Sequence, residues 1–333
     1  MKIGYNKIES LDIYSGFSTK DVCSSKSPEL SKFITNLPTL RSFYSNVLID
    51  PAAVRHLSLS RNLTTLSCRI PELQTTHCPI STLECLRDIN ICAPNLDSCT
   101  SFLKAIQAPS LQSLELQCNA PCTSSTVHAC LEAVSAFPRL RCLRLWADRV
   151  AYAFYQPKPC AISAHTLALL YGLRELEELH VEEHIELDLC DDDVLELARA
   201  WPAMGKLVFM ACAGAGEHDG YPRLTPRALA HVAKHCPRIH QLGLPFDAAE
   251  CGEALRDGLD AGDRGECLRT LDVHPPFSYV DEPREVAVFL HRLFPGLQAV
   301  RFTNTDAAVS HGWLHVAALL RAHTHADWED HLV

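Results

Sequence analysis

The chain of 333 residues lacks the marks of several common protein classes. No run of 18 apolar residues occurs, which argues against a membrane-spanning helix. The opening segment MKIGYNKIES has no apolar signal core. Neither a G-x-S-x-G turn nor a G-x-x-x-x-G-K-[ST] loop is present, so the common signatures of serine hydrolases and P-loop proteins are missing. The net charge of -10 argues against nucleic-acid binding, which depends on clustered Lys and Arg.

Zinc-binding patterns are missing as well. The tightest mixed cluster is Cys118, Cys122, His128 and Cys130. Its spacing differs from the two close pairs with a longer spacer that structural zinc sites favour. Two histidine pairs stand four residues apart on expected helices, but Val232 and Gly312 replace the glutamate that follows the first His in zinc hydrolases. We therefore expect no metal and no cofactor.

Cysteine, by contrast, is abundant, with 16 in the chain. Disulfide scaffolds are short and exported, and this chain is long and shows no export signal. Several cysteines also fall on repeat positions, where a thiol behaves as a small buried hydrophobe. The sequence predicts reduced structural cysteines and a cytoplasmic or nuclear protein.

One short phrase recurs along the chain: an apolar residue, two variable residues, an apolar residue, one variable residue and an apolar residue. Its ten clear copies begin at Ile8, Leu63, Leu86, Leu111, Leu140, Leu176, Met204, Ile239, Leu268 and Leu297, and a degenerate copy begins at Leu40. Successive copies are 23 to 36 residues apart. Self-similarity at this period is typical of a solenoid, and the phrase is the strand segment of a leucine-rich repeat.

Proline marks the junctions between these units. It stands two residues before the first apolar position at Pro38, Pro109, Pro138, Pro202, Pro237 and Pro295. Proline cannot continue a helix and favours extended geometry before it, so the sequence predicts that each helix ends there and the next strand begins.

Helix start signals lie between the strands. Thr225-Pro226 and Glu282-Pro283 place a proline at the first helical position, Ser163 precedes AHTLALLYGL, and three aspartates from Asp191 precede VLELARAW. Alternating strands and helices predict an α/β fold of about eleven repeats, with a curved parallel sheet on the concave side and helices on the convex side. We expect one domain over 1–333, with repeats over about 5–305 and a helical cap and tail over about 306–333.

Function in a solenoid is carried by the strand face opposite the core and by long loops. The residues expected on that face mix both charge signs with aromatics, as interfaces with proteins do. The candidate binding residues are Tyr44, Arg69, Glu115, Arg144, Trp146, His180, Glu182, Lys206, Met210, Asp272 and Arg301. Two long insertions follow such strands. One contains Tyr152, Phe154 and Tyr155, which either recognise a partner or cover the sheet edge. The other, FMACAGAGEHDGYP, is glycine-rich and favours a loop rather than a phosphate site.

Several segments combine a helix end, a junction proline and a strand phrase, among them FPRLRCLRLWAD, WPAMGKLVFMAC, HCPRIHQLGLPFD, FPGLQAVRFTN and LTPRALAHVAKHCP. They resemble the leucine-rich-repeat part of basidiomycete fungal F-box proteins, over about residues 30 to 305. The resemblance implies a substrate receptor for a ubiquitin ligase built from Skp, cullin and a RING subunit. No segment resembling an F-box precedes the first repeat, so a Skp adaptor is expected only if an F-box is encoded upstream.

The sequence thus predicts a scaffold without catalytic residues that binds a protein on its concave face and long loops. The resemblance implies the substrate-recognition part of an F-box receptor and a role in ubiquitin-dependent degradation. One alternative is a stand-alone leucine-rich-repeat binding protein unrelated to ubiquitin. Another is a metal-dependent hydrolase whose Cys, His and Asp residues converge only in the fold.

Overall fold

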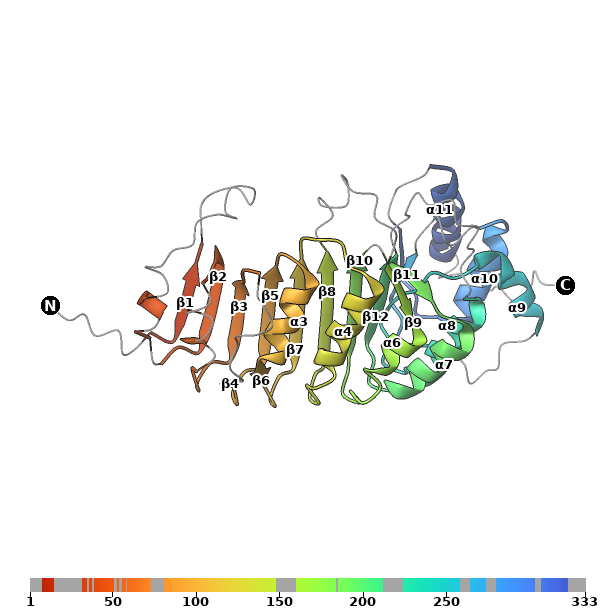
Figure 1. Cartoon of the computed structure of the whole chain (residues 1–333). Coiled ribbons are helices and arrows are strands. Elements are labelled where there is room, and N and C mark those ends of the chain that lie inside the picture. The colour runs from red at the N-terminus through yellow and green to blue at the C-terminus, as the bar shows by residue number, and fades with distance from the viewer. Residues whose placement is uncertain are drawn as a thin grey trace. The chain divides into compact units, whose positions relative to one another are not determined.

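Every copy of the repeated phrase forms a parallel strand in the computed structural model (Figure 1). The structure describes residues 8–14, 32–34, 36–37, 39–50, 53, 56–57, 59–72, 81–147, 160–183, 185–211, 224–257, 264–273, 280–302 and 307–322. The chain divides into two units, residues 1–157 and 158–333, and each is described by itself. The prediction that 1–333 is one domain stays a prediction.

Unit 1 contains six strands of the repeat, paired in sequence order. They are β1 (Ser10–Ile13), β2 (Ser42–Leu48), β3 (Thr65–Arg69), β5 (Asp88–Ala93), β7 (Ser113–Cys118) and β8 (Cys142–Ala147). Each is parallel to its neighbour, and the phrase positions are in register, as with Leu66, Ile89 and Leu114. One irregularity, between Ser45 and Leu48, shifts the register of β2 against β3.

Unit 2 repeats the pattern with five strands, again parallel and in sequence order. They are β10 (Glu178–Glu183), β12 (Lys206–Ala211), β13 (Gln241–Gly243), β14 (Thr270–Val273) and β15 (Ala299–Phe302). Leu179, Leu207, Leu242, Leu271 and Val300 are in register across the five strands. The predicted fold class is confirmed, because strands formed from the phrase alternate with helices as in a leucine-rich-repeat solenoid.

Burial alternates along each strand with the period of two that a pleated strand imposes. In β7, Leu114 and Leu116 are buried, whereas Glu115 between them is half-buried and Gln117 is exposed. At the first strand of unit 1 and the last of unit 2 this burial is weaker, and Leu11, Ile13, Val300 and Phe302 are all partly exposed. The core of each unit is therefore a row of stacked apolar side chains rather than one central cluster.

The junction prolines lie within four-residue turns. At the five junctions whose proline is described, from Pro109 to Pro295, the residue before the proline is buried and the proline is exposed. The peptide N–H of the first phrase residue donates there to the carbonyl of the residue before the proline. The N–O distances are 3.1 Å for Leu140 to Phe137 and 3.0 Å for Met204 to Trp201. Proline suits the second position of such a turn because its φ is already fixed there. Leu86 makes the same bond to Leu83 without any proline, so the residue favours the turn but is not required for it.

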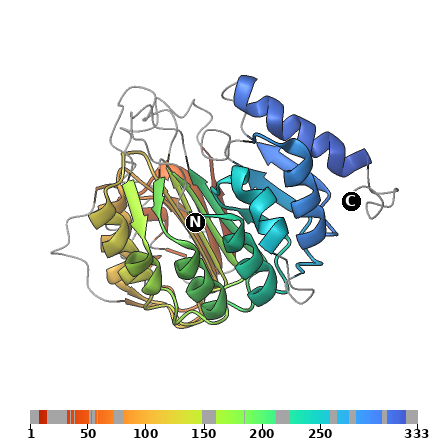
Figure 2. The same ribbon diagram turned by 90° about the vertical axis from the view of Figure 1, so that its right-hand side faces the viewer.

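Two helices of unit 1 are described over their whole length, α3 (Leu96–Lys104) and α4 (Ser124–Val134), and they pack against each other. Figure 1 shows both in front of the strands, and in Figure 2 these orange and yellow helices lie on one side of the strand layer. Asn95 caps α3 by accepting from the Ser98 N–H, and Thr123 caps α4 with a reciprocal bond to Thr126. Such caps satisfy backbone donors that have no partner within the helix.

Unit 2 is richer in helix, with α6 (Ala164–Ala168), α7 (Asp191–Ala200), α8 (Pro226–His235), α9 (Cys251–Asp257), α10 (Pro283–Leu293) and α11 (Ala307–Ala322). A 3₁₀ turn, η2 (Ala248–Glu250), leads into α9. The predicted starts at Pro226 and Pro283 are confirmed. Ser163 precedes α6 as expected, but its side chain makes no capping bond. The three aspartates lie inside the first turn of α7 rather than before it.

Two features of the helix side differ from the sequence analysis. The helix expected over residues 164–173 ends at Ala168, because the next amides bond three residues back, as Leu170 does to Leu167 at 2.9 Å. Two short pairs of parallel strands also form, separate from the main strands. β4 (Ser81–Thr82) pairs with β6 (Ile106–Gln107), and β9 (Cys160–Ser163) pairs with β11 (Ile185–Asp188).

Candidate protein-binding face

Along each strand, the buried phrase positions alternate with positions that point to the opposite side of the sheet. The candidate residues occupy these alternate positions, and we call this side the strand face. In unit 1, register places Tyr44, Ser67, Asn90, Glu115 and Arg144 side by side on five successive strands. The Arg144 guanidinium lies 3.8 Å from the Glu115 carboxylate, and both side chains are about one-third exposed. Two candidate residues from separate repeats are therefore brought together as an ion pair.

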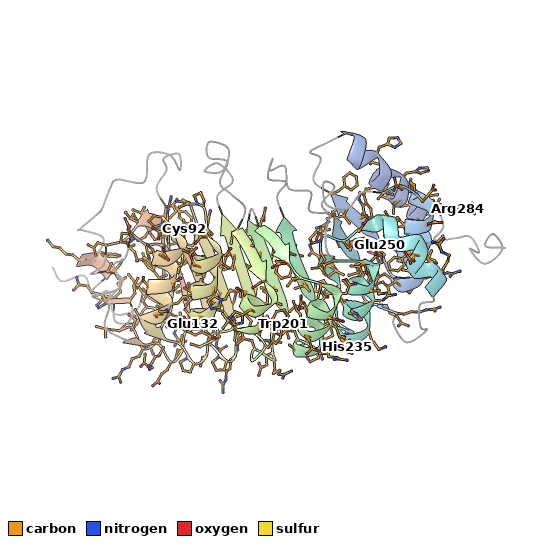
Figure 3. All side chains as sticks on the ribbon, turned by 45° about the vertical axis from the view of Figure 1, so that its right-hand side comes forward. Cys92, Glu132, Trp201, His235, Glu250 and Arg284 are labelled. Atoms are coloured by element: carbon orange, nitrogen blue, oxygen red, sulfur yellow. The ribbon has the colours of Figure 1, made fainter. Side chains whose placement is uncertain are left out.

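A second row of side chains in unit 1 lies two residues further along the strands. Arg69, Cys92, Gln117 and Trp146 are in register there, and Figure 3 labels Cys92 on β5. At the N-terminal strands, the rings of Tyr14 and Tyr44 lie 5.0 Å apart, and Tyr14 is 67% exposed. Unit 1 thus presents tyrosine, arginine and tryptophan on one face, the residue types that are enriched in interface cores.

In unit 2 the strand face has a closer ion pair. Lys206 Nζ lies 2.9 Å from Glu178 Oε1, and both side chains are less than one-fifth exposed. The two residues are directly opposite each other on β10 and β12. Water and ions screen a partly buried ion pair less than an exposed one. The pair of Lys206 and Glu178 therefore restrains its side chains more strongly than the pair in unit 1 does.

His180 differs from the expectation of a solvated residue at the strand face. Its side chain points to the predicted side, but the residue is only 8% exposed. Its Nε2 lies 3.9 Å from the Glu182 carboxylate on the same strand. Val208, its register partner on β12, is buried as well. The alternation along β10 predicts the side to which His180 points but not how deeply it is buried.

Asp272 has a partner that the sequence analysis did not select. The Gln241 Nε2 donates to the Asp272 carboxylate over 2.6 Å, across the β13–β14 pair. Gly243 on β13, the register partner of Asp272, is tightly packed, because an added Cβ would lie 3.0 Å from Val208 Cγ1 and 3.2 Å from Asp272 Cβ. Arg301 is in register with Asp272 and exposed. The signal for Gln241 was its outward position in the phrase that begins at Ile239.

Some predicted features lie outside the described residues. They are the side chain of Met210, the aromatic insertion with Tyr152, Phe154 and Tyr155, and most of the glycine-rich insertion. The backbone of Met210 is described, and it is in register with Glu182. The proposed contribution of these loops to binding stays a prediction.

Three buried thiols, those of Cys68, Cys236 and Cys251, have properties suited to packing rather than to nucleophilic chemistry. Burial raises the pKa of the Cys236 thiol to about 12, and its Sγ lies 3.7 Å from the carbonyl oxygens of Ala198 and Trp201. Burial also raises the pKa of Cys68, and burial followed by the charge of Asp247 raises that of Cys251. Since the thiolate is the reactive form, these three cysteines are poor nucleophiles near neutral pH.

Over the described ranges, no three His, Cys, Asp or Glu side chains gather in a way that could hold a metal ion. Cys118 and Cys122 from the cluster noted in the sequence do meet, with their sulfurs 3.4 Å apart. In the same part of the chain, no helix has the length and apolarity needed to cross a membrane. The expectation of no metal and no cofactor stays a prediction.

No protein-family model and no curated protein matches this sequence. Among solved structures, the chain is similar to the leucine-rich-repeat-containing protein LegL7 from Legionella pneumophila, with 11% identity and a TM-score of 0.32 over 96% of this chain and 98% of that one. It is also similar to a chain in the crystal structure of the Rad7 and Elc1 complex in yeast, with 12% identity and a TM-score of 0.35 over 87% and 86%. These low scores add nothing to the fold assignment, which rests on the strands and their register.

Proposed function

We propose that this chain is a protein-interaction scaffold that binds its partner through the strand face. The observation that carries the proposal is the alignment of Tyr44, Glu115 and Arg144 in one row and of Arg69 and Trp146 in the next. A face with both charge signs and large aromatics offers apolar contact area together with orienting polar groups. The raised pKa values of the buried thiols support a role without covalent catalysis.

The finer proposal is that the partner is a substrate of a ubiquitin ligase, and that this chain is the recognition part of an F-box type receptor. The support is the resemblance of the helix, proline and strand junctions to that family, together with the repeated turn that those junctions form. Docking of a Skp adaptor is assigned to no residue of this chain.

A charge reversal on the strand face tests the first proposal. We expect Arg144→Glu to reduce the partner recovered in a pull-down at least tenfold, because it places two like charges side by side at Glu115 and removes a cation from the face. Lys104→Glu is the matched control, since Lys104 pairs with Glu132 at 3.5 Å across α3 and α4 on the helix side; Figure 3 labels Glu132 there. Equal loss in both variants, or unchanged recovery with Arg144→Glu, contradicts binding through this face.

The ligase proposal has a separate test. The full-length product is used as bait, and we expect Skp and cullin subunits to co-purify together with a protein whose half-life lengthens when the bait gene is deleted. Partners that depend on Arg144 in the absence of any Skp, cullin or change in half-life would favour the stand-alone scaffold. That result would overturn the ligase proposal and leave the binding face intact.

A further inference from the structure

Cys118 and Cys122 form a close dithiol in the turn between β7 and α4. The two Sγ atoms are 3.4 Å apart, and both lie near the carbonyl oxygen of Ala120, at 3.6 and 3.9 Å. Cys118 is the last residue of β7, and Cys122 immediately precedes Thr123, the N-cap of α4. Two ordered elements therefore fix the ends of a five-residue turn with the thiols facing each other.

We propose that this pair is a reversible oxidation site, in which Cys118 and Cys122 form an intramolecular disulfide when the protein meets a hydroperoxide. A disulfide has its sulfurs at about 2.05 Å, so the pair must close by about 1.3 Å, a distance that small side-chain rotations within a turn can supply. The site belongs to the turn itself and does not depend on the proposed binding function.

Exposure indicates the order of events. Cys122 is 7% exposed and is flanked by the exposed Pro121 and Thr123, whereas Cys118 is 1% exposed. The Cys122 thiol loses its proton, the thiolate attacks one peroxide oxygen, and the O–O bond breaks. A sulfenic acid forms, and the departing hydroxide takes up the thiol proton and leaves as water when the oxidant is hydrogen peroxide. The Cys118 sulfur then attacks Cys122 Sγ, the S–O bond breaks, and a second water leaves with the thiol proton. Two thiols lose two electrons in total, and the peroxide gains them.

The chain offers a direct readout of this bond. Cleavage after Lys104 and Arg139 releases one peptide, residues 105–139, that contains three cysteines: Cys118, Cys122 and Cys130. The native full chain is treated with hydrogen peroxide, unfolded, alkylated and digested. We expect this peptide to carry one alkyl group, on Cys130, and dithiothreitol given before alkylation to restore all three. The thiol count of the unfolded chain falls by two from 16 in the same experiment.

Three variants separate the proposed pair from general thiol oxidation. Cys130→Ser is the matched control, because Cys130 is also buried in this region, and it is expected to leave the bridge unchanged. Cys118→Ser is expected to abolish the bridge and to leave a sulfenic acid on Cys122 that a dimedone probe labels. Cys122→Ser is expected to abolish the bridge without such labelling, and it changes the more exposed of the two positions, so it keeps the test available if Cys118→Ser does not fold.

Two results would overturn the proposal. One is a peptide that keeps three alkyl groups at a peroxide dose that oxidises the exposed Cys85 and Cys267. The other is a bridge that includes Cys130, shown by an alkyl group on Cys118 or Cys122 instead.

Discussion

Unit 1 and unit 2 use the same strand phrase with different lengths of chain between strands. Ser42, Thr65 and Asp88 are equivalent in register and 23 residues apart, whereas Lys206 and Gln241 in unit 2 are 35 residues apart. In unit 2, α8 lies within this 35-residue step, whereas α7 lies in the 28-residue step from Glu178 to Lys206 and α10 in the 29-residue step from Thr270 to Ala299. The step from β3 to β5 contains only the two-residue strand β4 among its described residues.

This difference shows that strand and spacer have separate tasks. The strand ladder is the same in both units: the carbonyl of the residue before each strand accepts from two successive amides of the next strand, as Thr64 does from Arg87 and Asp88, and Gly205 from His240 and Gln241. A short connection between two strands is enough to bring the chain back to the start of the next strand, beside the first. The helix of a long spacer adds a second apolar layer, so we expect unit 2 to depend more on its helix side.

The largest expected effect is at Trp201, which opens the turn after α7 (Figure 3). The side chain is fully buried, and its Nε1 donates to the Leu170 carbonyl over 3.1 Å. We expect Trp201→Ala to lower the free energy of unfolding by about 3–5 kcal/mol, because it leaves a large cavity and removes one of the two hydrogen bonds to the Leu170 carbonyl, the other coming from the Leu173 N–H. Chemical denaturation followed by circular dichroism measures it.

Leu83 supplies the matched position in a short repeat, since it opens the equivalent turn and is 1% exposed. Leu83→Ala removes fewer buried atoms, and we expect a loss near the lower end of the range for leucine, about 2–3 kcal/mol. If Leu83→Ala lowered the free energy of unfolding as much as Trp201→Ala, the helix side of unit 2 would not contribute more to stability than that of unit 1.

The next effect concerns a link between two helices of unit 2. The Asp191 carboxylate, in the first turn of α7, accepts from the Thr225 N–H at 2.9 Å and from its hydroxyl at 2.6 Å. Thr225 is the N-cap of α8, so one carboxylate ties together the starts of neighbouring helices. We expect Asp191→Ala to destabilise the protein by about 2 kcal/mol, the usual range for hydrogen bonds to a charged group.

Asp192 in the same turn provides the control, because it has the same charge at the same helix end and is exposed. We expect Asp192→Ala to cost less than about 1 kcal/mol, through the helix dipole alone. Similar values for the two variants in thermal melts would contradict a specific role for the link to Thr225.

The strands and several helix starts could be predicted from the sequence because they depend on local chemistry. The phrase that begins at Leu111 predicts β7, and Thr225-Pro226 predicts α8, since spacing and φ are properties of a few adjacent residues. The bond between Asp191 and Thr225 joins residues 34 apart in the chain, so no local pattern indicates it. The burial of His180 is likewise not indicated by the alternation along its strand, and the approach of Cys118 to Cys122 depends on the path of one turn.

The pH dependence at Cys236 gives a smaller effect. Burial raises the pKa of this thiol to about 12 in the folded chain, above the unfolded value near 9. The raised pKa means that the protonated thiol stabilises the fold below the unfolded pKa, and this stability is lost as pH rises toward the folded value. Between pH 8 and pH 10 we expect this one group to lower the free energy of unfolding by about 1.4 kcal/mol, because pH 10 is about one unit above the unfolded pKa of the thiol.

Cys236→Ala tests this dependence, since alanine does not titrate. We expect the variant to be less stable at pH 8 but to lose about 1.4 kcal/mol less than the parent between pH 8 and pH 10 in urea unfolding. Cys267→Ala, at an exposed thiol in the same unit, is expected to leave the slope unchanged. A parallel pH dependence in parent and Cys236→Ala would show that this thiol is not what weakens unit 2 at alkaline pH.

The smallest effect compares the two ion pairs of the strand face. Lys206 and Glu178 in unit 2 are 2.9 Å apart and less than one-fifth exposed, whereas Arg144 and Glu115 in unit 1 are 3.8 Å apart and about one-third exposed. Double-mutant cycles with Lys206→Met and Glu178→Gln should give a coupling of about 1 kcal/mol, and the cycle with Arg144→Met and Glu115→Gln less than about 0.5 kcal/mol. We expect 1 M salt to weaken the pair of unit 1 more, because water and ions reach it more easily. A larger coupling in unit 1 would mean that its residues are held rigidly in the free protein.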